Sequence, residues 1–172
     1  MGHLLATVQK AQAKAGGELA VWVTLAVTPS GLLPDSLAVV QEMLSAGVTI
    51  SGVNLMTFDF GPLGGQTVLS ASESALSSTA AQIQPLGLDS WSELGATIME
   101  GRTDTAGQVW NLSDAQAFWN FAYTHRLGRV SAWSLLRDQQ CSGTPPQPNK
   151  SCSGVTQPLQ QFSKILGNQT TP

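Results

Sequence analysis

Apolar runs alternate with amphipathic segments along this chain. Four runs have the near-continuous Val, Leu, Ile and Met content of buried strands: Leu19–Val27, Ile50–Asp59, Gly95–Gly101 and Arg129–Leu136. A segment with helical apolar spacing precedes the first run and one follows each run: His3–Ala15, Asp35–Ala46, Ser70–Gln84, Asp114–Leu127 and Pro158–Leu166. This alternation predicts an α/β fold with a parallel sheet. Two architectures fit the pattern, a small doubly wound sheet and half of a (β/α)8 barrel.

Residues at the ends of these segments refine the expected helix boundaries. Ser113 and Gln116 have the spacing of a capping box at the start of the fourth helix, and Gly128 stands where a left-handed C-cap is expected. Pro158 is a suitable first residue for the last helix. The third helix is the least marked of the five, because its Ser- and Ala-rich stretch has few large apolar side chains.

Length and charge limit the classes of function. The 172 residues predict one domain, 1–172, with 42% apolar and 11% charged residues and a net charge of −3. No basic patch is available for nucleic acid or an anionic membrane, so we expect neither as a partner. The longest apolar run, Leu19–Val27, has nine residues, whereas a membrane span needs about 20. No basic-then-apolar signal segment follows Met1.

Cofactor and metal motifs are also missing from the sequence. The glycines of residues 61–65 match neither the dinucleotide fingerprint nor the phosphate-binding loop, and they are expected to form a simple loop. Neither His3 nor His125 has a potential ligand at helical spacing. No Gly-x-Ser-x-Gly nucleophile motif is present. We therefore expect no cofactor and no metal.

Cys141 and Cys152 lie eleven residues apart in a segment rich in Pro, Gly and Ser. A disulfide between them would close a short loop without rearranging a core. The alternative is a pair of free thiols in a cytosolic loop. The bridge is favoured because cysteine is usually buried and such a loop offers no core, and it would indicate an exported protein.

The ends of two predicted strands hold the candidate chemistry. Asp59 follows directly after an apolar strand, and the last strand contains Trp133 and leads into Arg137. Functional sites of parallel βα sheets form where the strands reach their carboxyl ends. Asp59 is a strong candidate because an unpaired carboxylate beside apolar neighbours is costly. Trp133 is interpreted either as a core side chain or as a platform for a ligand.

These residues resemble glycoside hydrolase family 18, and specifically its bacterial-type chitinases. Residues 56–59 read Met-Thr-Phe-Asp, where the sixth barrel strand of that family carries Met-x-Tyr-Asp. Trp133 matches the tryptophan under the −1 sugar site on the eighth strand, and residues 97–101 resemble the seventh. Residues 137–141 and 151–155 are also similar to that subfamily. The resemblance covers about residues 17–167 and implies barrel strands five to eight, preceded by one helix.

The resemblance implies a substrate-assisted retaining hydrolysis of β-1,4 N-acetylglucosamine linkages, in which the N-acetyl group of the substrate attacks the anomeric carbon. Met56, Phe58, Asp59, Met99 and Trp133 would contact substrate, with Glu100 and Arg137 as further candidates. Phe58 lacks the hydroxyl that many members supply with tyrosine. Glu100 stands where an apolar residue is expected, and it is interpreted as a solvated loop carboxylate or a partner of a nearby arginine rather than as an acid catalyst.

The acid motif of the family, Asp-x-x-Asp-x-Asp-x-Glu, matches none of the eleven carboxylates in the chain. We therefore expect that the chain begins just after the catalytic acid, that it contains no catalytic residue, and that it is inactive alone. Three functions remain open: the C-terminal half of a chitinase, a non-catalytic module that binds chitin or N-acetylglucosamine, and a self-assembling half barrel. The expected partners are chitin oligomers and either a missing N-terminal half or a second copy, in an extracellular setting.

Overall fold

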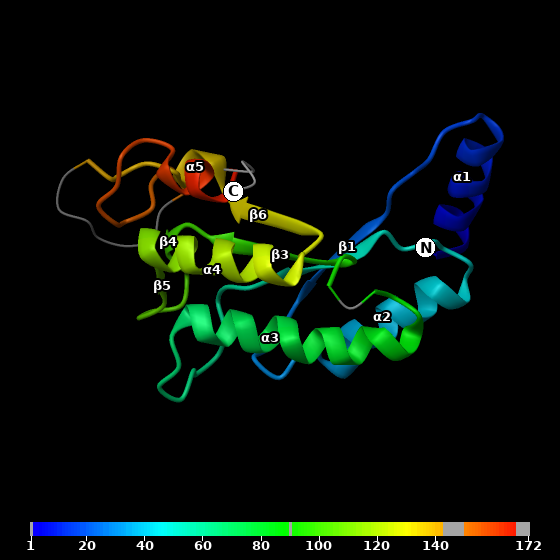
Figure 1. Ribbon diagram of the computed structural model, residues 1–172, viewed down its shortest axis with the longest axis horizontal. Helices are drawn as coiled ribbons and strands as arrows, with labels where there is room; N and C mark the ends of the chain where they lie inside the picture. The colour runs from blue at the N-terminus through cyan, green and yellow to red at the C-terminus, as the bar shows by residue number, and fades with distance from the viewer. Residues whose placement is uncertain (1, 90, 143–149, 168–172) are drawn as a thin grey trace.

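A four-stranded parallel sheet forms the centre of the molecule (Figure 1). The computed structural model describes residues 2–89, 91–142 and 150–167. The strands are β1 (Trp22–Ala26), β2 (Gly52–Met56), β3 (Leu94–Met99) and β6 (Arg129–Trp133), in the order β1-β2-β3-β6. The spatial order follows the chain order without a reversal, so the sheet lacks the switch point of a doubly wound fold. The α/β prediction is confirmed, and the doubly wound alternative does not fit this order.

All five predicted helices are present, within a few residues of their expected ends. They are α1 (Gly2–Lys14), α2 (Pro34–Ser45), α3 (Val68–Ile83), α4 (Leu112–His125) and α5 (Gln161–Leu166). Helices α2, α3 and α4 each connect one strand to the next strand of the parallel sheet. Single 3-10 turns, η1 (Gln84–Leu86) and η2 (Leu135–Arg137), follow α3 and β6. A short antiparallel pair, β4 (Gly101–Arg102) with β5 (Val109–Trp110), was not predicted.

Each of the four strands is shorter than the apolar run that predicted it. β2 ends at Met56, and the next residue, Thr57, donates both its backbone N–H and its hydroxyl to the carbonyl of Thr97. Two residues further on, Asp59 adopts a left-handed conformation that leaves the sheet. Of the apolar residues beyond the paired segments, Val27 and Ile50 are buried, whereas Leu135 and Leu136 are exposed.

The main core lies between the sheet and its connecting helices. Val53, Leu55, Leu94 and Ile98 are fully buried on the helix side of the two central strands. Helix α3 buries a stripe of mostly small side chains at helical spacing, namely Val68, Ala71, Ser72, Ala75, Leu76, Thr79, Ala80 and Ile83. Small residues allow this helix to approach the sheet closely, which explains why large apolar anchors are scarce in its sequence.

The opposite face of the sheet has different chemistry. Near its amino-terminal end, the guanidinium carbon of Arg129 lies 4.4 Å above the ring of Trp22. That ring covers Gly52, where an added Cβ would come within 2.4 Å of it. Above the stack, the amide of Asn54 donates to the hydroxyl of Thr97 at 2.9 Å. This face is therefore lined by a cation–π pair and a polar contact instead of a continuous apolar layer.

The expected caps of α4 are wrong at both ends. Asn111 and Asp114 form the capping box, because β5 ends at Trp110 and Asn111 is the first residue free to turn into the helix. At the other end, Arg126 takes the left-handed position that was assigned to Gly128. Gly128 instead lies against the carbonyl oxygen of Ser92, where an added Cβ would be only 1.9 Å away. A close approach of two backbones, and not a helix cap, requires this glycine.

The last helix begins three residues later than predicted. Pro158 precedes α5, whose N-cap is Gln160 in a left-handed conformation. The helix starts at Gln161 because the carboxylate of Asp138 accepts the backbone N–H groups of Phe162 and Ser163 at 2.9 and 2.7 Å. A carboxylate from another element therefore satisfies the first turn, which is a favourable place for negative charge.

Candidate functional site

The candidate residues from three neighbouring strands lie together at the carboxyl edge of the sheet. Met99 on β3 is in register with Trp133 on β6, and Met56 on β2 is in register with Thr97 of β3. Asp59 follows β2 by three residues. Of the two methionines, Met99 is buried and Met56 is half-buried. The parallel register thus brings the predicted residues to the same end of the sheet.

Trp133 is an exposed aromatic side chain at the end of β6. Its exposed fraction is 58%, which excludes the interpretation as a core side chain. The peptide bond that joins it to Ser134 is cis. Leu135 and Leu136, which follow in η2, are exposed as well. A flat aromatic ring with an open face suits stacking against the apolar face of a sugar ring.

Asp59 is held in place by the hairpin that follows β3. Its φ angle is 52°, and its Oδ1 atom accepts the backbone N–H of Thr105 at 2.8 Å. The carboxylate is half-buried and is one of the residues that line a cleft. Phe58 beside it is also half-buried and has no hydroxyl to donate. At residues 58 and 59, the side chain that can form hydrogen bonds is therefore the carboxylate, which accepts from polar hydrogens.

Gln108 positions the same loop and was not identified from the sequence. Its Oε1 accepts the N–H of Phe60 at 3.1 Å, and its Nε2 donates to the carbonyls of Phe60 and Gly61 at 2.5 and 3.2 Å. The indole N–H of Trp110 donates to the carbonyl of Thr57 at 3.3 Å. These contacts attach the loop after β2 to the β4–β5 hairpin. Their partners are 47 residues or more apart, so no local pattern indicates them.

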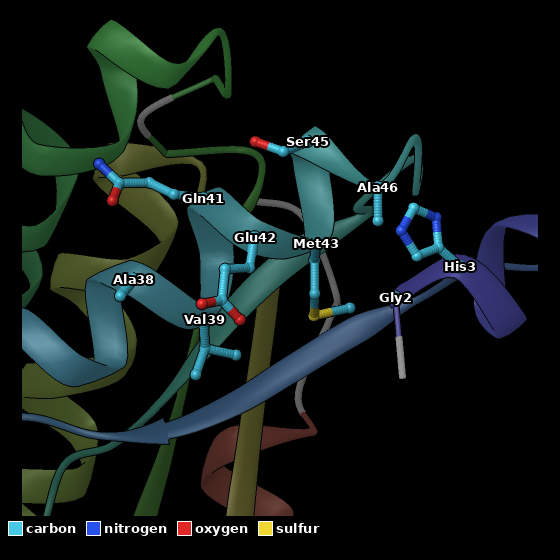
Figure 2. A pocket seen from close by; sticks show the side chains of 9 residues that line it. All are labelled: Gly2, His3, Ala38, Val39, Gln41, Glu42, Met43, Ser45 and Ala46. Atoms are coloured by element: carbon cyan, nitrogen blue, oxygen red, sulfur yellow. The ribbon is translucent and has the colours of Figure 1, made fainter.

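The cleft beside Asp59 lies between these two loops. It has a volume of about 540 Å³ and is lined by residues 59–63, 66 and 105–108. A second cleft, of about 750 Å³, lies between the first turn of α1 and helix α2 (Figure 2). His3, Glu42 and Met43 are among its lining residues. Because α2 leads into β2, this second cleft is near the amino-terminal edge of the sheet, away from the candidate site.

Arg137 is buried beneath the carboxyl edge and binds backbone carbonyls. Its Nε and Nη2 atoms donate to the carbonyl of Glu100 at 3.3 and 3.0 Å, and Nη2 also donates to the carbonyl of Arg102. Burial lowers the pKa of the guanidinium, while the carboxylates of Asp104, Glu100 and Asp59 oppose that shift. Arg137 therefore joins η2 to β4. We interpret it as a buried residue that holds the backbone at this edge of the sheet in place.

Glu100 does not fit its sequence-based interpretation as a solvated loop carboxylate. Its exposed fraction is 0%, and neither carboxylate oxygen has a hydrogen-bond partner among the described residues. Burial raises its pKa to about 8, and the nearby charge of Asp138 adds to this effect while Arg137 opposes it. The carboxyl group is consequently neutral over most of the range below pH 8.

The disulfide between Cys141 and Cys152 is present, with Cα atoms 5.0 Å apart. Cys152 is buried, and the next residue, Ser153, accepts the N–H of Arg102 at 2.8 Å through its carbonyl. The bridge therefore fixes a segment that packs against β4. The expected bridge is confirmed, and the alternative of two free thiols does not hold.

Removal of this bridge is expected to lower the free energy of unfolding. For a loop closed by residues eleven positions apart, the chain-entropy model gives about 3 kcal/mol. The double variant Cys141→Ser, Cys152→Ser should show this loss in urea unfolding. Intact-mass measurement should first show that the unreduced protein gains two hydrogen masses on reduction. Two thiols that alkylate without reductant would contradict the bridge.

Two kinds of feature, a cluster of metal ligands and a membrane-spanning helix, are absent from the described ranges. No group of three or more His, Cys, Asp or Glu side chains there is arranged to hold a metal ion. None of the helices in those ranges is long and apolar enough to cross a membrane.

Comparison with known proteins relates the chain to chitinases. No family model matches it. It is 32% identical over 167 residues to a "Probable bifunctional chitinase/lysozyme" of Escherichia coli (strain K12), covering 88% of this chain and 18% of that protein. It is also 32% identical over 136 residues to "Endochitinase 11" of Metarhizium anisopliae, covering 72% of this chain and 26% of that protein. The chain thus spans about a quarter or less of these relatives.

Solved structures give the same relationship for the fold. The catalytic domain of a hyperthermophilic chitinase from Pyrococcus furiosus matches 98% of this chain with a TM-score of 0.82 and 22% identity, and the match covers 56% of that domain. Catalytic-site mutants of active domain 2 of a thermostable chitinase from the same organism, complexed with chito-oligosaccharides, match with a TM-score of 0.81 and 24% identity.

The parallel sheet, the residues at its carboxyl edge and these relatives together define a chitinase-like glycoside hydrolase. The resemblance found in the Met-Thr-Phe-Asp and tryptophan motifs agrees with this class. The chain is therefore chitinase-like, and these relatives agree with its resemblance to glycoside hydrolase family 18.

Proposed function

We propose that this chain is the half of a family 18 barrel that contains strands five to eight, and that its carboxyl edge binds N-acetylglucosamine oligomers of chitin. The order of the four strands, each joined to the next by a helix, supports this placement. So does the match of nearly the whole chain to just over half of a chitinase domain. In this arrangement residues 1–172 are one part of a single catalytic domain.

The exposed ring of Trp133 is the observation that carries the proposed binding role. It lies at the strand end where a (β/α)8 enzyme binds its substrate, next to the buried Met99. The carboxylate of Asp59, fixed by Thr105, supplies a hydrogen-bond acceptor at the same edge. A ring for stacking and a fixed acceptor are the two elements that a site for an N-acetylated sugar needs, because the sugar offers apolar C–H faces and polar hydrogens.

The complete barrel would hydrolyse the β-1,4 linkage by the substrate-assisted retaining route. There the N-acetyl carbonyl oxygen bonds to the anomeric carbon while the bond to the leaving oxygen breaks, and a glutamic acid gives its proton to that oxygen. The acid motif is absent from these 172 residues. We propose that the chain contributes sugar binding and that a second polypeptide segment must contribute the acid.

The partner in this proposal is an N-terminal half barrel that completes the sheet. In the described ranges, β1 and β6 each pair with a single neighbour, so both outer edges are available for further strands. An extracellular setting is proposed as well, since the Cys141–Cys152 bridge is typical of oxidising compartments.

Binding of a chitin tetramer to the purified chain tests the proposal directly. Replacing Trp133 with Ala should weaken the affinity at least about tenfold, because a large apolar contact is lost. Tyr123, an exposed aromatic residue on helix α4, provides the matched control, and Tyr123→Ala should leave the affinity unchanged. Isothermal titration calorimetry measures both values. If the tetramer does not bind, or if both variants lose affinity equally, the proposed site is wrong.

A further inference from the structure

Glu100 is a buried carboxyl group at the carboxyl edge that the proposed mechanism does not use. It follows Met99 at the end of β3 and is completely buried. Its carboxylate oxygens have no hydrogen-bond partner among the described residues. A charged carboxylate without such partners is costly in a buried environment, whereas a neutral carboxylic acid is tolerated far better.

The backbone of Glu100 connects the two features of the site that lie on either side of it. Its N–H donates to the carbonyl of Trp133 at 3.1 Å. Its carbonyl accepts from the guanidinium of Arg137 at 3.0 Å. The backbone of Glu100 therefore holds both Trp133, the proposed sugar-stacking residue, and Arg137.

The segment around the disulfide packs against the backbone that directly follows Glu100. Gly101 has a φ of 75°, and an added Cβ there would come within 2.0 Å of the carbonyl oxygen of Ser153. The carbonyl of Ser153 also accepts the N–H of Arg102. The backbone on the carboxyl side of the buried Glu100 is therefore held in place by these contacts.

We propose that Glu100 is a positioning residue of the sugar site, held as a neutral carboxylic acid, and that its ionisation loosens the end of β6 and η2 on which Trp133 stands. This inference rests on the proposed function in one respect only, namely that the site at Trp133 binds a sugar. The positioning itself concerns the chain alone and can be tested without a ligand.

The surrounding charges favour the neutral form. Asp138, just after η2, faces Glu100 and repels a second negative charge, while Arg137 attracts it. The guanidinium of Arg137 interacts with three carboxyl groups, those of Asp104, Glu100 and Asp59. Arg102 on β4 directs its Nε to the carbonyl of Gly154. The segment from residue 152 to 157 has no titratable side chain apart from the disulfide-bonded cysteine.

The sign of the pH effect follows from the direction of this shift. The pKa of Glu100 rises from 4.5 to about 8 in the folded chain. The closed state is fully favoured below pH 4.5, and this advantage is lost as the pH rises to about 8. Over that range the equilibrium between opened and closed forms changes by up to about tenfold per pH unit.

Hydrogen exchange measured by mass spectrometry tests the inference on the ligand-free chain. Protection of the amides in residues 129–139, corrected for intrinsic exchange, should fall in the wild type by more than about tenfold between pH 5 and pH 8. In Glu100→Gln, which keeps the shape but cannot ionise, protection should stay constant. Glu18→Gln, a change at an exposed carboxylate, should behave as the wild type.

Several outcomes would overturn the proposal. Protection that is independent of pH in the wild type, or that falls equally in Glu100→Gln, shows that Glu100 does not control this segment. If Glu100→Gln does not fold, Glu100→Leu gives a second neutral side chain for the same comparison. If neither folds, the profile of the wild type decides alone. Binding of the chitin tetramer is measured in parallel, so that absent binding with a pH-dependent segment contradicts the proposed function and not this inference.

Discussion

Incubation of the purified chain with chitin oligomers is expected to release no product above the uncatalysed rate. Without a carboxylic acid beside the glycosidic oxygen, the leaving sugar must depart as an alkoxide. General-acid assistance is typically worth about 10²–10⁴-fold, and the positioning of the N-acetyl group adds to this loss. Co-expression with an N-terminal family 18 half that contains Asp-x-x-Asp-x-Asp-x-Glu should restore turnover, which chromatography of the released oligomers measures.

Variants of the complemented complex identify the residues that this chain contributes. Asp59→Ala and Trp133→Ala should each remove most of the recovered activity, because both side chains lie at the carboxyl edge where the substrate binds. Tyr123→Ala on α4 is the control and should retain activity. Hydrolysis by the isolated chain that disappears in Glu100→Gln would contradict this prediction and would make Glu100 the acid.

Substitution of Gly128 by Ala is expected to prevent stable folding. The added Cβ would lie 1.9 Å from the carbonyl oxygen of Ser92 and 3.2 Å from the ring of Trp22. Neither contact is with the flexible end of a side chain, so the backbone of β6 would have to move. Overpacking costs typically 1–3 kcal/mol and sometimes more, and the two N–H···O bonds from Gly128 to Trp91 and Leu94 would be disturbed as well.

Gly61→Ala provides the control for this experiment. A Cβ at Gly61 would meet no atom within 4 Å, and the residue is outside the left-handed region. Thermal unfolding followed by circular dichroism should therefore show a near-native midpoint for Gly61→Ala and little folded protein for Gly128→Ala. Equal midpoints for both variants would show that the contact with Ser92 relaxes easily.

The sequence is sufficient to predict the order of the four parallel strands and the five helices, because apolar periodicity is a local property, but it does not predict the short pair of β4 and β5. It is less informative about the residues at which helices and strands begin and end. Asn111 and Ser113 are both good N-cap residues, and pairing of β5 with β4 selects Asn111 by using the chain up to Trp110. Gly128 was predicted as a helix cap, but the glycine is required by a neighbouring backbone that is 36 residues away in the sequence.

The candidate site shows the same division between local and distant information. Asp59 and Trp133 are identifiable because they follow apolar runs at strand ends. The burial of Glu100 is not identifiable, because burial depends on segments that are distant in the sequence; the segment that packs on the neighbouring Gly101, for example, follows Cys152 some fifty positions later. Gln108 is missed for the same reason, because its role depends on contact with a loop 48 residues earlier.

The stack of Arg129 on Trp22 has a consequence for access to the open face of the sheet. It occupies the amino-terminal end of that face, and the ring covers Gly52. Once a partner covers the remaining sides, solvent and sugar would exchange through one entrance only, at the Trp133 end. Product would then leave by the path along which substrate arrived, and a long chitin chain would have to lie across this opening instead of threading through the barrel.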